Sequence, residues 1–198
     1  MNSYFDEMFA VIEASIESMD EKNYERLLNE SENTIRHGGK IIASGLGKNV
    51  PICEKFVGTL NSLGVDARFL HTNTAVHGDL GMVGEGDLVI LLSKGGNTVE
   101  TVQLAQYLKD RGTNTWLFTF SHNAKSGEYV DKQLILDLKN EGDDWDIVPN
   151  NSTTVNLIVL QSVAIELGRK LGITLNDFKK NHPGGGIGAR LRGEQIWK

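Results

Sequence analysis

The sequence predicts a single α/β domain in which a five-stranded parallel sheet is flanked by helices on both faces. Two observations predict this fold. Short segments rich in branched and aromatic residues alternate with segments of helical spacing, and glycine, asparagine or aspartate bounds most of the short segments. This alternation is typical of parallel strands joined by right-handed helical crossovers. The 198 residues fit one domain of ordinary size, so we expect residues 1–198 to form one unit.

The predicted elements follow in order along the chain. Residues 1–36 place apolar side chains at helical spacing, with a break near 20–23, and predict two helices that pack on the core or on a neighbouring subunit. Five strands are predicted at 40–44, 65–70, 88–93, 115–120 and 133–138, and further helices near 50–63, 98–111 and 152–171. Residues 174–198 are expected to form a C-terminal tail.

Composition and charge exclude several classes of partner. The formal net charge is −6 and no basic stripe occurs, which argues against nucleic acid as a partner. No apolar run approaches the roughly 20 residues that span a bilayer, and the acidic N-terminus does not resemble a signal peptide. We therefore expect a cytoplasmic protein with no membrane segment. The single cysteine, Cys53, excludes an intrachain disulfide and is expected in the core.

Glycine-rich loops follow the first and third predicted strands, and a polar segment precedes the last long helix. Parallel sheets bind ligands beyond the carboxyl ends of their strands, and N–H groups at helix starts bind anions. The first loop, at 44–49, lacks a glycine that nucleoside-triphosphate loops and dinucleotide fingerprints require. Ordinary turns and helix caps are the alternative interpretation. The residues expected to bind a phosphate are Ser44, Gly45, Gly47, Asn49, Ser93, Gly95, Gly96, Asn97, Thr98, Ser152 and Thr153.

Histidines in irregular segments are candidates for proton transfer. His77 lies with Asp79 between the second and third strands, and His182 lies in the glycine-rich tail. An imidazole with a pKa near 6.5 exchanges protons readily at neutral pH. Such a residue can equally lie on the surface without a catalytic role, or hold a loop in place through hydrogen bonds. His71 and His77 could also ligate a divalent metal, but no close pairing of ligands such as HExxH occurs. We expect no required cofactor.

Several segments together resemble one enzyme family. They are Gly45-Leu46-Gly47-Lys48, HGDLGM from His77, the loop at Ser93, Pro149 to Thr154, Asp177-Phe178 and HPGGGIGARL from His182. Over about 40–192 the chain is similar to the arabinose 5-phosphate isomerases, a family built on the sugar isomerase (SIS) domain. The resemblance implies a flavodoxin-like three-layer sandwich, a sugar phosphate as substrate and assembly into tetramers. Most members also carry paired CBS domains; the chain stops at Lys198, so we expect no such module.

The resemblance also implies a set of active-site residues. They fall on Lys48, Glu100, Glu141 and His182. Glu141 is placed only by its spacing to Pro149, because the motif around it differs from the family's. The family has serine at three positions that here are Asn49, Gly95 and Asn151. The phosphate loops therefore differ from the family's, and the sequence does not determine which phosphosugar is the substrate.

Isomerisation of an aldose to a ketose suits these residue types. The reaction moves a proton between C1 and C2 through an enediol and needs a base, an acid and a cation, but no redox cofactor. We expect Lys48 to stabilise negative charge, His182 or Glu100 to carry the proton, and Glu141 to assist ring opening or position a hydroxyl. Because His182 sits on a tail, we expect it to reach a neighbouring subunit's site in a dimer or tetramer with shared active sites.

Three other functions stay open. The protein could isomerise a different phosphosugar with similar loops. It could be a noncatalytic sugar-phosphate sensor, although such sensors usually carry a DNA-binding helix-turn-helix, which the acidic first 36 residues do not resemble. It could be a purely structural subunit, but the presence of all four active-site residues that the resemblance implies argues against this.

Overall fold

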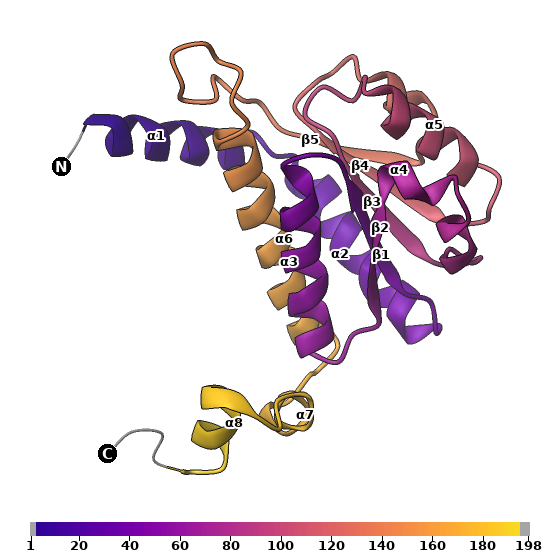
Figure 1. Ribbon diagram of the computed structural model, residues 1–198, viewed down its shortest axis with the longest axis vertical. Coiled ribbons are helices and arrows are strands. Elements are labelled where there is room, and N and C mark those ends of the chain that lie inside the picture. The colour runs from indigo at the N-terminus through magenta and orange to yellow at the C-terminus, as the bar shows by residue number, and fades with distance from the viewer. Residues whose placement is uncertain (1–2, 195–198) are drawn as a thin grey trace.

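Five parallel strands form one sheet in the computed structural model, which describes residues 3–194 (Figure 1). The strand order is β2-β1-β3-β4-β5, and all four neighbouring pairs are parallel. The strands are β1 (Ile41–Gly45), β2 (Ala67–His71), β3 (Leu88–Leu92), β4 (Asn114–Thr119) and β5 (Lys132–Ile135). The predicted fold class is confirmed. β5 is shorter than predicted because it ends at Ile135, opposite Thr119, the last residue of β4.

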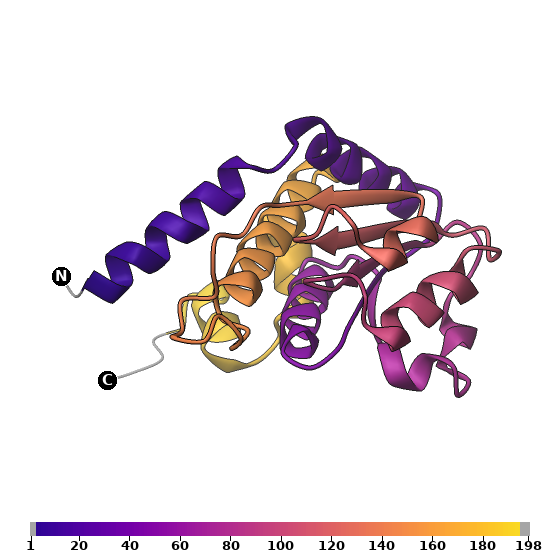
Figure 2. The ribbon, with the colours of Figure 1, turned by 90° about the horizontal axis from the view of Figure 1, so that it is seen from above.

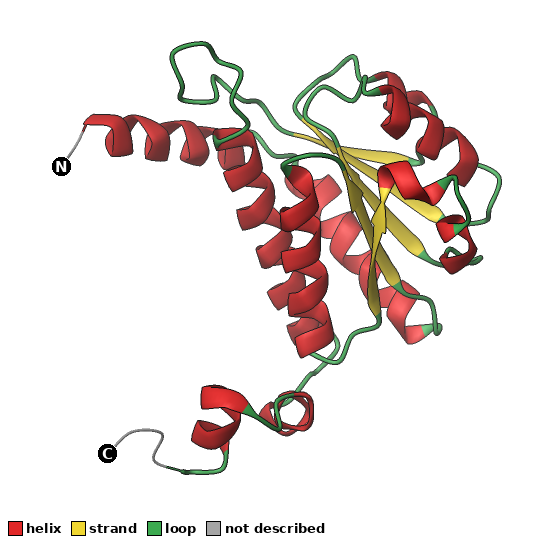
Figure 3. Ribbon diagram, viewed as in Figure 1, coloured by secondary structure: helices red, strands yellow, loops and turns green. Residues whose placement is uncertain are grey.

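Helices cover both faces of the sheet (Figures 1 and 3). One face carries α2 (Glu21–Arg36), α3 (Asn49–Ser62) and α6 (Asn151–Lys170). The other face carries α4 (Thr72–Ala75), α5 (Val99–Leu108), and the short 3₁₀ helices η1 (Asp79–Met82) and η2 (Lys125–Glu128). Within residues 3–194, no helix is both long enough and apolar enough to cross a membrane.

The two N-terminal helices separate at Asp20, where the sequence predicts a break. The Asp20 carboxylate accepts a hydrogen bond from the backbone N–H of Asn23 at 2.9 Å and caps α2. The preceding helix, α1 (Ser3–Glu17), extends away from the body of the domain (Figure 2). It contacts α6, and its buried residues lie in the C-terminal half of α1. It buries Val11, Ile12 and Ser15.

Side chains of the sheet alternate between two cores, one on each face. In β3, Leu88, Ile90 and Leu92 pack against α2, α3 and α6, whereas Val89 and Leu91 pack beneath α4 and α5. Successive side chains of a strand point to opposite faces, so a strand buried on both sides has a continuous apolar sequence. This double burial explains why β3 is recognisable in the sequence.

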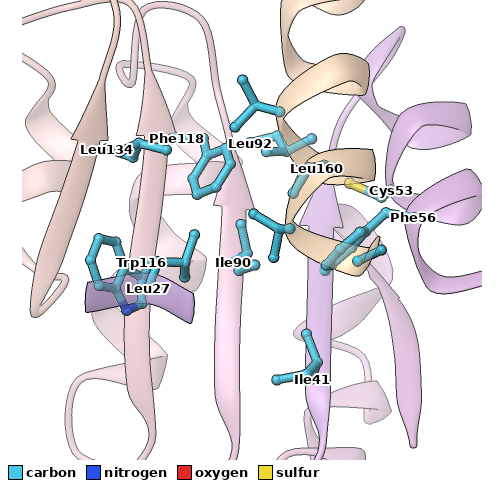
Figure 4. Packing of buried hydrophobic residues seen from close by; sticks show 14 of the residues in the cluster. Leu27, Ile41, Cys53, Phe56, Ile90, Leu92, Trp116, Phe118, Leu134 and Leu160 are labelled. Atoms are coloured by element: carbon cyan, nitrogen blue, oxygen red, sulfur yellow. The ribbon is translucent and has the colours of Figure 1, made fainter. Parts of the chain in front are cut away.

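The core beneath α2, α3 and α6 holds the largest buried side chains (Figure 4). Trp116, Phe118 and Phe56 are fully buried there. Burial of a large apolar side chain stabilises a fold by roughly 1.5–3 kcal/mol. Cys53 lies in the same core, as predicted, and burial raises the pKa of its thiol to about 12. The thiol therefore stays protonated and packs as a small apolar group.

The C-terminal tail begins at the far end of α6 and contains α7 (Leu175–Asn181) and α8 (Gly185–Leu191). α6 starts beside the carboxyl ends of the strands, and its 20 residues make it about 30 Å long. The tail therefore lies at the opposite end of the domain from the strand-end loops (Figure 1).

Candidate active site

The carboxyl ends of β1 and β3 lie side by side, and the chain leaves them toward opposite faces of the sheet. Gly45 at the end of β1 is opposite Leu92 at the end of β3. β1 continues into α3 on one face, and β3 continues into α5 on the other. A switch of direction of this kind leaves a crevice in which parallel sheets bind ligands. The two predicted phosphate loops, 44–49 and 93–98, flank this crevice.

The first loop presents Lys48 to solvent. Gly47 has a φ of 55°, a left-handed conformation that favours glycine, and the exposed Lys48 follows it as the N-cap residue of α3. Gly45 allows β1 and α3 to approach closely, because a Cβ at this position would lie 2.9 Å from Asn49 Cβ and 3.2 Å from Cys53 Sγ. The two glycines thus fix the path of the backbone from β1 into α3, on which Lys48 lies.

Two predicted binding residues of this loop have partners within the chain. Ser44 is buried and shares a hydrogen bond of 3.0 Å with the hydroxyl of Thr72. The side-chain oxygen of Asn49 accepts a hydrogen bond of 3.2 Å from Nδ2 of Asn156, a buried residue of α6. This bond uses the carbonyl of the Asn49 amide, whose NH₂ group is a donor of the kind that binds phosphate oxygens. Asn156 therefore orients Asn49.

The second loop is held in shape by its own polar groups. The N–H of Gly96 donates to Ser93 Oγ at 3.2 Å, and the N–H of Lys125 donates to Asn97 Oδ1 at 2.9 Å. Gly96 has a φ of 65°, and a Cβ on it would lie 2.2 Å from the Cβ of Ala124. Both the conformation and the space at Gly96 therefore require glycine.

The remaining residues of the second loop face open space at the start of α5. A Cβ on Gly95 would have no neighbour within 4 Å. Thr98 is the N-cap residue of α5, but its side chain makes no capping hydrogen bond, and Glu100 is exposed in the first turn. This stretch of loop is therefore open to solvent.

A pocket of about 370 Å³ joins Glu100 to the predicted His77. Its lining residues are Thr72, Asn73, Val76, His77, Glu100 and Gln103. Asp79 is exposed at the start of η1 and does not line this pocket. The structure thus brings one predicted histidine and one predicted acid to the same hollow on the α5 face.

Glu141 is a fully buried carboxylate at the N-terminus of α6. Its Oε2 accepts hydrogen bonds from the backbone N–H groups of Asn150 at 3.0 Å and Ser152 at 2.9 Å. Its Oε1 accepts one from Ser152 Oγ at 2.6 Å and lies 2.8 Å from Nζ of Lys94. Glu141 has no exposed surface, whereas the side chain of Lys94 is 45% exposed.

The ionisation of Glu141 follows from these contacts. Burial by itself raises the pKa of a carboxyl group, because it disfavours the charged form. The ammonium of Lys94 and the donors of Ser152 and Asn150 outweigh burial and hold the pKa of Glu141 below its usual value. Glu141 is therefore a carboxylate at neutral pH and carries no proton to donate.

The first turn of α6 is engaged by Glu141. Ser152 is buried and donates both its N–H and its hydroxyl to this carboxylate. Thr153 Oγ1 donates to the backbone oxygen of Asn150 at 2.9 Å. Two N–H groups at this helix start, those of Asn150 and Ser152, thus already bind an internal anion.

His182 lies apart from the other predicted catalytic residues of its own chain. Its ring stacks on Phe178 with centroids 3.9 Å apart, and its Nδ1 lies 2.9 Å from the backbone oxygen of Phe178. It follows α7, beyond the far end of α6 (Figure 1). Within one chain, the structure brings together the loops of Lys48 and Glu100 but not the tail.

The histidines suggested as metal ligands do not form a cluster. His71 caps α4, with Nδ1 accepting a hydrogen bond of 3.3 Å from the N–H of Asn73. Across the described part of the chain, 3–194, no three His, Cys, Asp or Glu side chains gather so as to hold a metal ion.

Lys94 and Asn156 are site residues that the sequence does not single out. Lys94 joins the second loop to the start of α6 through Glu141, and Asn156 orients Asn49 of the first loop. One signal of Lys94 is present in the sequence, since it is a cation directly between Ser93 and two glycines. Asn156 gives no such signal, because a polar residue within a helix usually faces solvent.

Comparison with known proteins places this site in a family. The SIS domain model matches residues 34–166. The arabinose 5-phosphate isomerase KpsF of Escherichia coli is 36% identical over 173 residues, which are 87% of this chain and 54% of that protein. The chain thus spans about half the length of the curated relatives it matches.

Solved structures share the fold over nearly their whole length. The c3406 protein of E. coli CFT073, solved in complex with arabinose 5-phosphate, is 32% identical, with a TM-score of 0.84, and the match covers 91% of this chain and 94% of that one. A Listeria monocytogenes protein is 26% identical, with a TM-score of 0.85 and coverage of 92% and 94%. With the SIS domain model matching more than half of the sequence, and with this sheet and these strand-end loops, the chain belongs to the SIS domain family.

Proposed function

We propose that the protein is an aldose–ketose isomerase that interconverts arabinose 5-phosphate and ribulose 5-phosphate. The observation that carries the proposal is the pairing of two glycine loops across the switch point of the sheet, with Lys48 on one loop and Glu100 after the other. Relatives at about one-third identity that are named arabinose 5-phosphate isomerases support the choice of sugar. The altered loop residues Asn49 and Gly95 make a related phosphosugar the natural second substrate to test.

The reaction requires one proton to move between two carbons. A base removes the proton from C2 of the aldose, the electron pair forms the C1–C2 double bond, and the C1 carbonyl oxygen takes up a proton to give the enediol. The C2 hydroxyl of the enediol then gives up its proton and becomes a carbonyl, while C1 accepts a proton from the protonated base. Glu100 or His182 serves as the base, and the exposed ammonium of Lys48 stabilises the negative charge that develops on the sugar oxygens.

The protein is proposed to work as a homo-oligomer in which the tail of one subunit completes its neighbour's site. Two observations support this. His182 lies beyond the far end of the roughly 30 Å α6 helix from its own Lys48 loop. The tail also exposes apolar side chains, Leu175 at 61% and Ile187 at 53%, which association would bury. A cytoplasmic location and the absence of nucleic-acid partners stay predictions from the sequence.

Turnover of arabinose 5-phosphate and of a panel of other phosphosugars by the purified chain tests the proposal. We expect measurable isomerisation, with kcat lowered roughly 100-fold or more in Lys48→Met and His182→Ala. Lys55→Met is the matched control, because Lys55 lies on the same helix α3 but bonds Thr59 and Gln161 outside the crevice. Binding of every sugar phosphate without turnover would instead identify a sensor.

A further inference from the structure

Glu141 is saturated with donors and closed to solvent. Four bonds reach its two oxygens, from the N–H groups of Asn150 and Ser152, the hydroxyl of Ser152 and the ammonium of Lys94. No part of its side chain is exposed. A carboxylate in this state cannot touch a substrate without breaking the cap of α6.

Lys94 is the solvent-facing end of the same pair. Its side chain is 45% exposed, and an ammonium has three donors, of which Glu141 uses one. The backbone of Lys94 is fixed as well, because its carbonyl accepts hydrogen bonds of 2.9 Å from both the Phe120 N–H and Thr119 Oγ1. Lys94 is therefore held both at its backbone carbonyl and at its ammonium group.

The charges of the pair are arranged with the positive end outward. The negative charge of Glu141 is spread into the N–H groups of the first turn of α6, which carries the positive end of the helix dipole. The side chain of Lys94 is partly exposed, and at the next residue, Gly95, a Cβ would meet nothing within 4 Å. Lys94 and Gly95 thus form an exposed stretch of the loop that carries one cation.

Lys94 and Lys48 lie on loops that follow neighbouring strands. β1 and β3 are adjacent in the sheet, and each lysine comes shortly after the carboxyl end of its strand. An anion bound at the switch point would therefore have a cation on each of the two adjacent loops, which would compensate locally for the net charge of −6.

We propose that Lys94 contacts the phosphate group of the substrate and that Glu141 is its positioning residue. The inference rests on the proposed function for the identity of the sugar, but it concerns any phosphomonoester dianion. Glu141 holds the ammonium of Lys94 in place before the substrate arrives, so less side-chain freedom is lost on binding. The acid that the resemblance places in the active site therefore acts through a lysine.

Binding of inorganic phosphate and of arabinose 5-phosphate to the full chain, measured by calorimetry, tests the proposal alongside kcat and KM. Lys94→Met should weaken both ligands by roughly 10- to 100-fold and raise KM by the same factor, with a smaller effect on kcat. Lys94→Arg should restore most of the affinity, because it keeps the charge. Lys125→Met, which removes an exposed charge on the neighbouring η2, should change affinity by less than about twofold.

A second variant separates binding from folding. Lys94→Met leaves the buried Glu141 unpaired, which destabilises the fold. The double variant Lys94→Met/Glu141→Gln removes the unpaired charge and should fold, yet still bind phosphate as weakly as Lys94→Met. Wild-type affinity in the double variant, an equal loss in Lys125→Met, or no phosphate binding by the wild type would each overturn the proposal. If phosphate binds through Lys94 but no sugar is turned over, only the proposed isomerase activity fails.

Discussion

The indole of Trp116 donates a hydrogen bond from Nε1 to Oε2 of Glu30 at 2.9 Å and ties α2 to β4. The same carboxylate oxygen accepts a bond of 2.8 Å from Asn114 Nδ2 and lies 3.2 Å from Nζ of Lys132. Glu30 thus satisfies the polar atom of the largest buried side chain and joins α2, β4 and β5.

Glu30→Ala should lower the free energy of unfolding by about 1–3 kcal/mol, because it leaves the buried N–H of Trp116 without an acceptor. Urea denaturation followed by circular dichroism measures the change. Glu25→Ala, an exposed position on the same helix, is the control and should stay within about 0.5 kcal/mol of wild type. Equal losses in the two variants would mean that the Trp116 bond adds nothing.

Stability should fall in acid through Glu30 and Glu141. Burial by itself raises the pKa of each, but the donors of Glu30 and the Lys94 and Ser152 contacts of Glu141 lower both below the ordinary 4.5. A lowered native pKa gives stability that is present above 4.5 and is lost as pH falls through the native value.

The slope of unfolding free energy against pH below 4.5 measures this contribution. Glu30→Gln and Glu141→Gln should each flatten that slope, since an amide does not titrate in this range. Glu13→Gln, on the exposed side of α1, should leave it as in wild type. The interpretation is wrong if the slope is the same in all four proteins.

Gly96→Ala should destabilise the protein by several kcal/mol or prevent folding, because the new Cβ would lie 2.2 Å from Ala124 Cβ at a residue with φ of 65°. Gly95→Ala is a neighbouring control, since its Cβ would meet nothing within 4 Å. Thermal unfolding should therefore separate two adjacent glycines, and similar melting temperatures for the two variants would contradict the loop geometry.

Lys48→Met and His182→Ala should complement one another if sites are shared between subunits. Each variant alone is expected to be inactive, whereas co-expression should return about a quarter of wild-type activity, as expected for random pairing into a symmetric dimer. The tagged hybrid, which has one intact site of two, is then isolated and should isomerise arabinose 5-phosphate at about half of the wild-type rate. Hybrids that stay inactive would show that both residues serve the same subunit's site.

Local patterns are sufficient to predict the sheet. β3 is recognisable because Leu88 to Leu92 are buried on both faces, and α2 because Asp20 caps it next to a break in the helical spacing. The largest difference is at the end of β5, which stops opposite the last residue of β4 and before the end of its own apolar run, whereas β2 begins two residues later than predicted, at Ala67.

The site is predictable only where it is built from consecutive residues. The loops at 44–49 and 93–98 are visible in the sequence because glycines and hydroxyls stand directly after strands. The pairing of Lys94 with Glu141 is not, because it joins residues far apart in the chain through the packing of α6. For the same reason, spacing alone shows neither that Ser152 binds Glu141 nor where the tail of His182 lies.

The helix α6 is anchored at both ends. Glu141 binds its first turn, and Arg36 donates a bond of 2.9 Å to the carbonyl of Lys170, its last residue. Because both ends of α6 are fixed, the number of residues in this helix determines the distance between the strand-end loops and the tail. Adding or deleting one turn would move the last residue of α6 by about 5.4 Å and break the bond between Arg36 and the Lys170 carbonyl. In the proposed homo-oligomer, the length of α6 would therefore determine how far a subunit's tail lies from its own Lys48 loop.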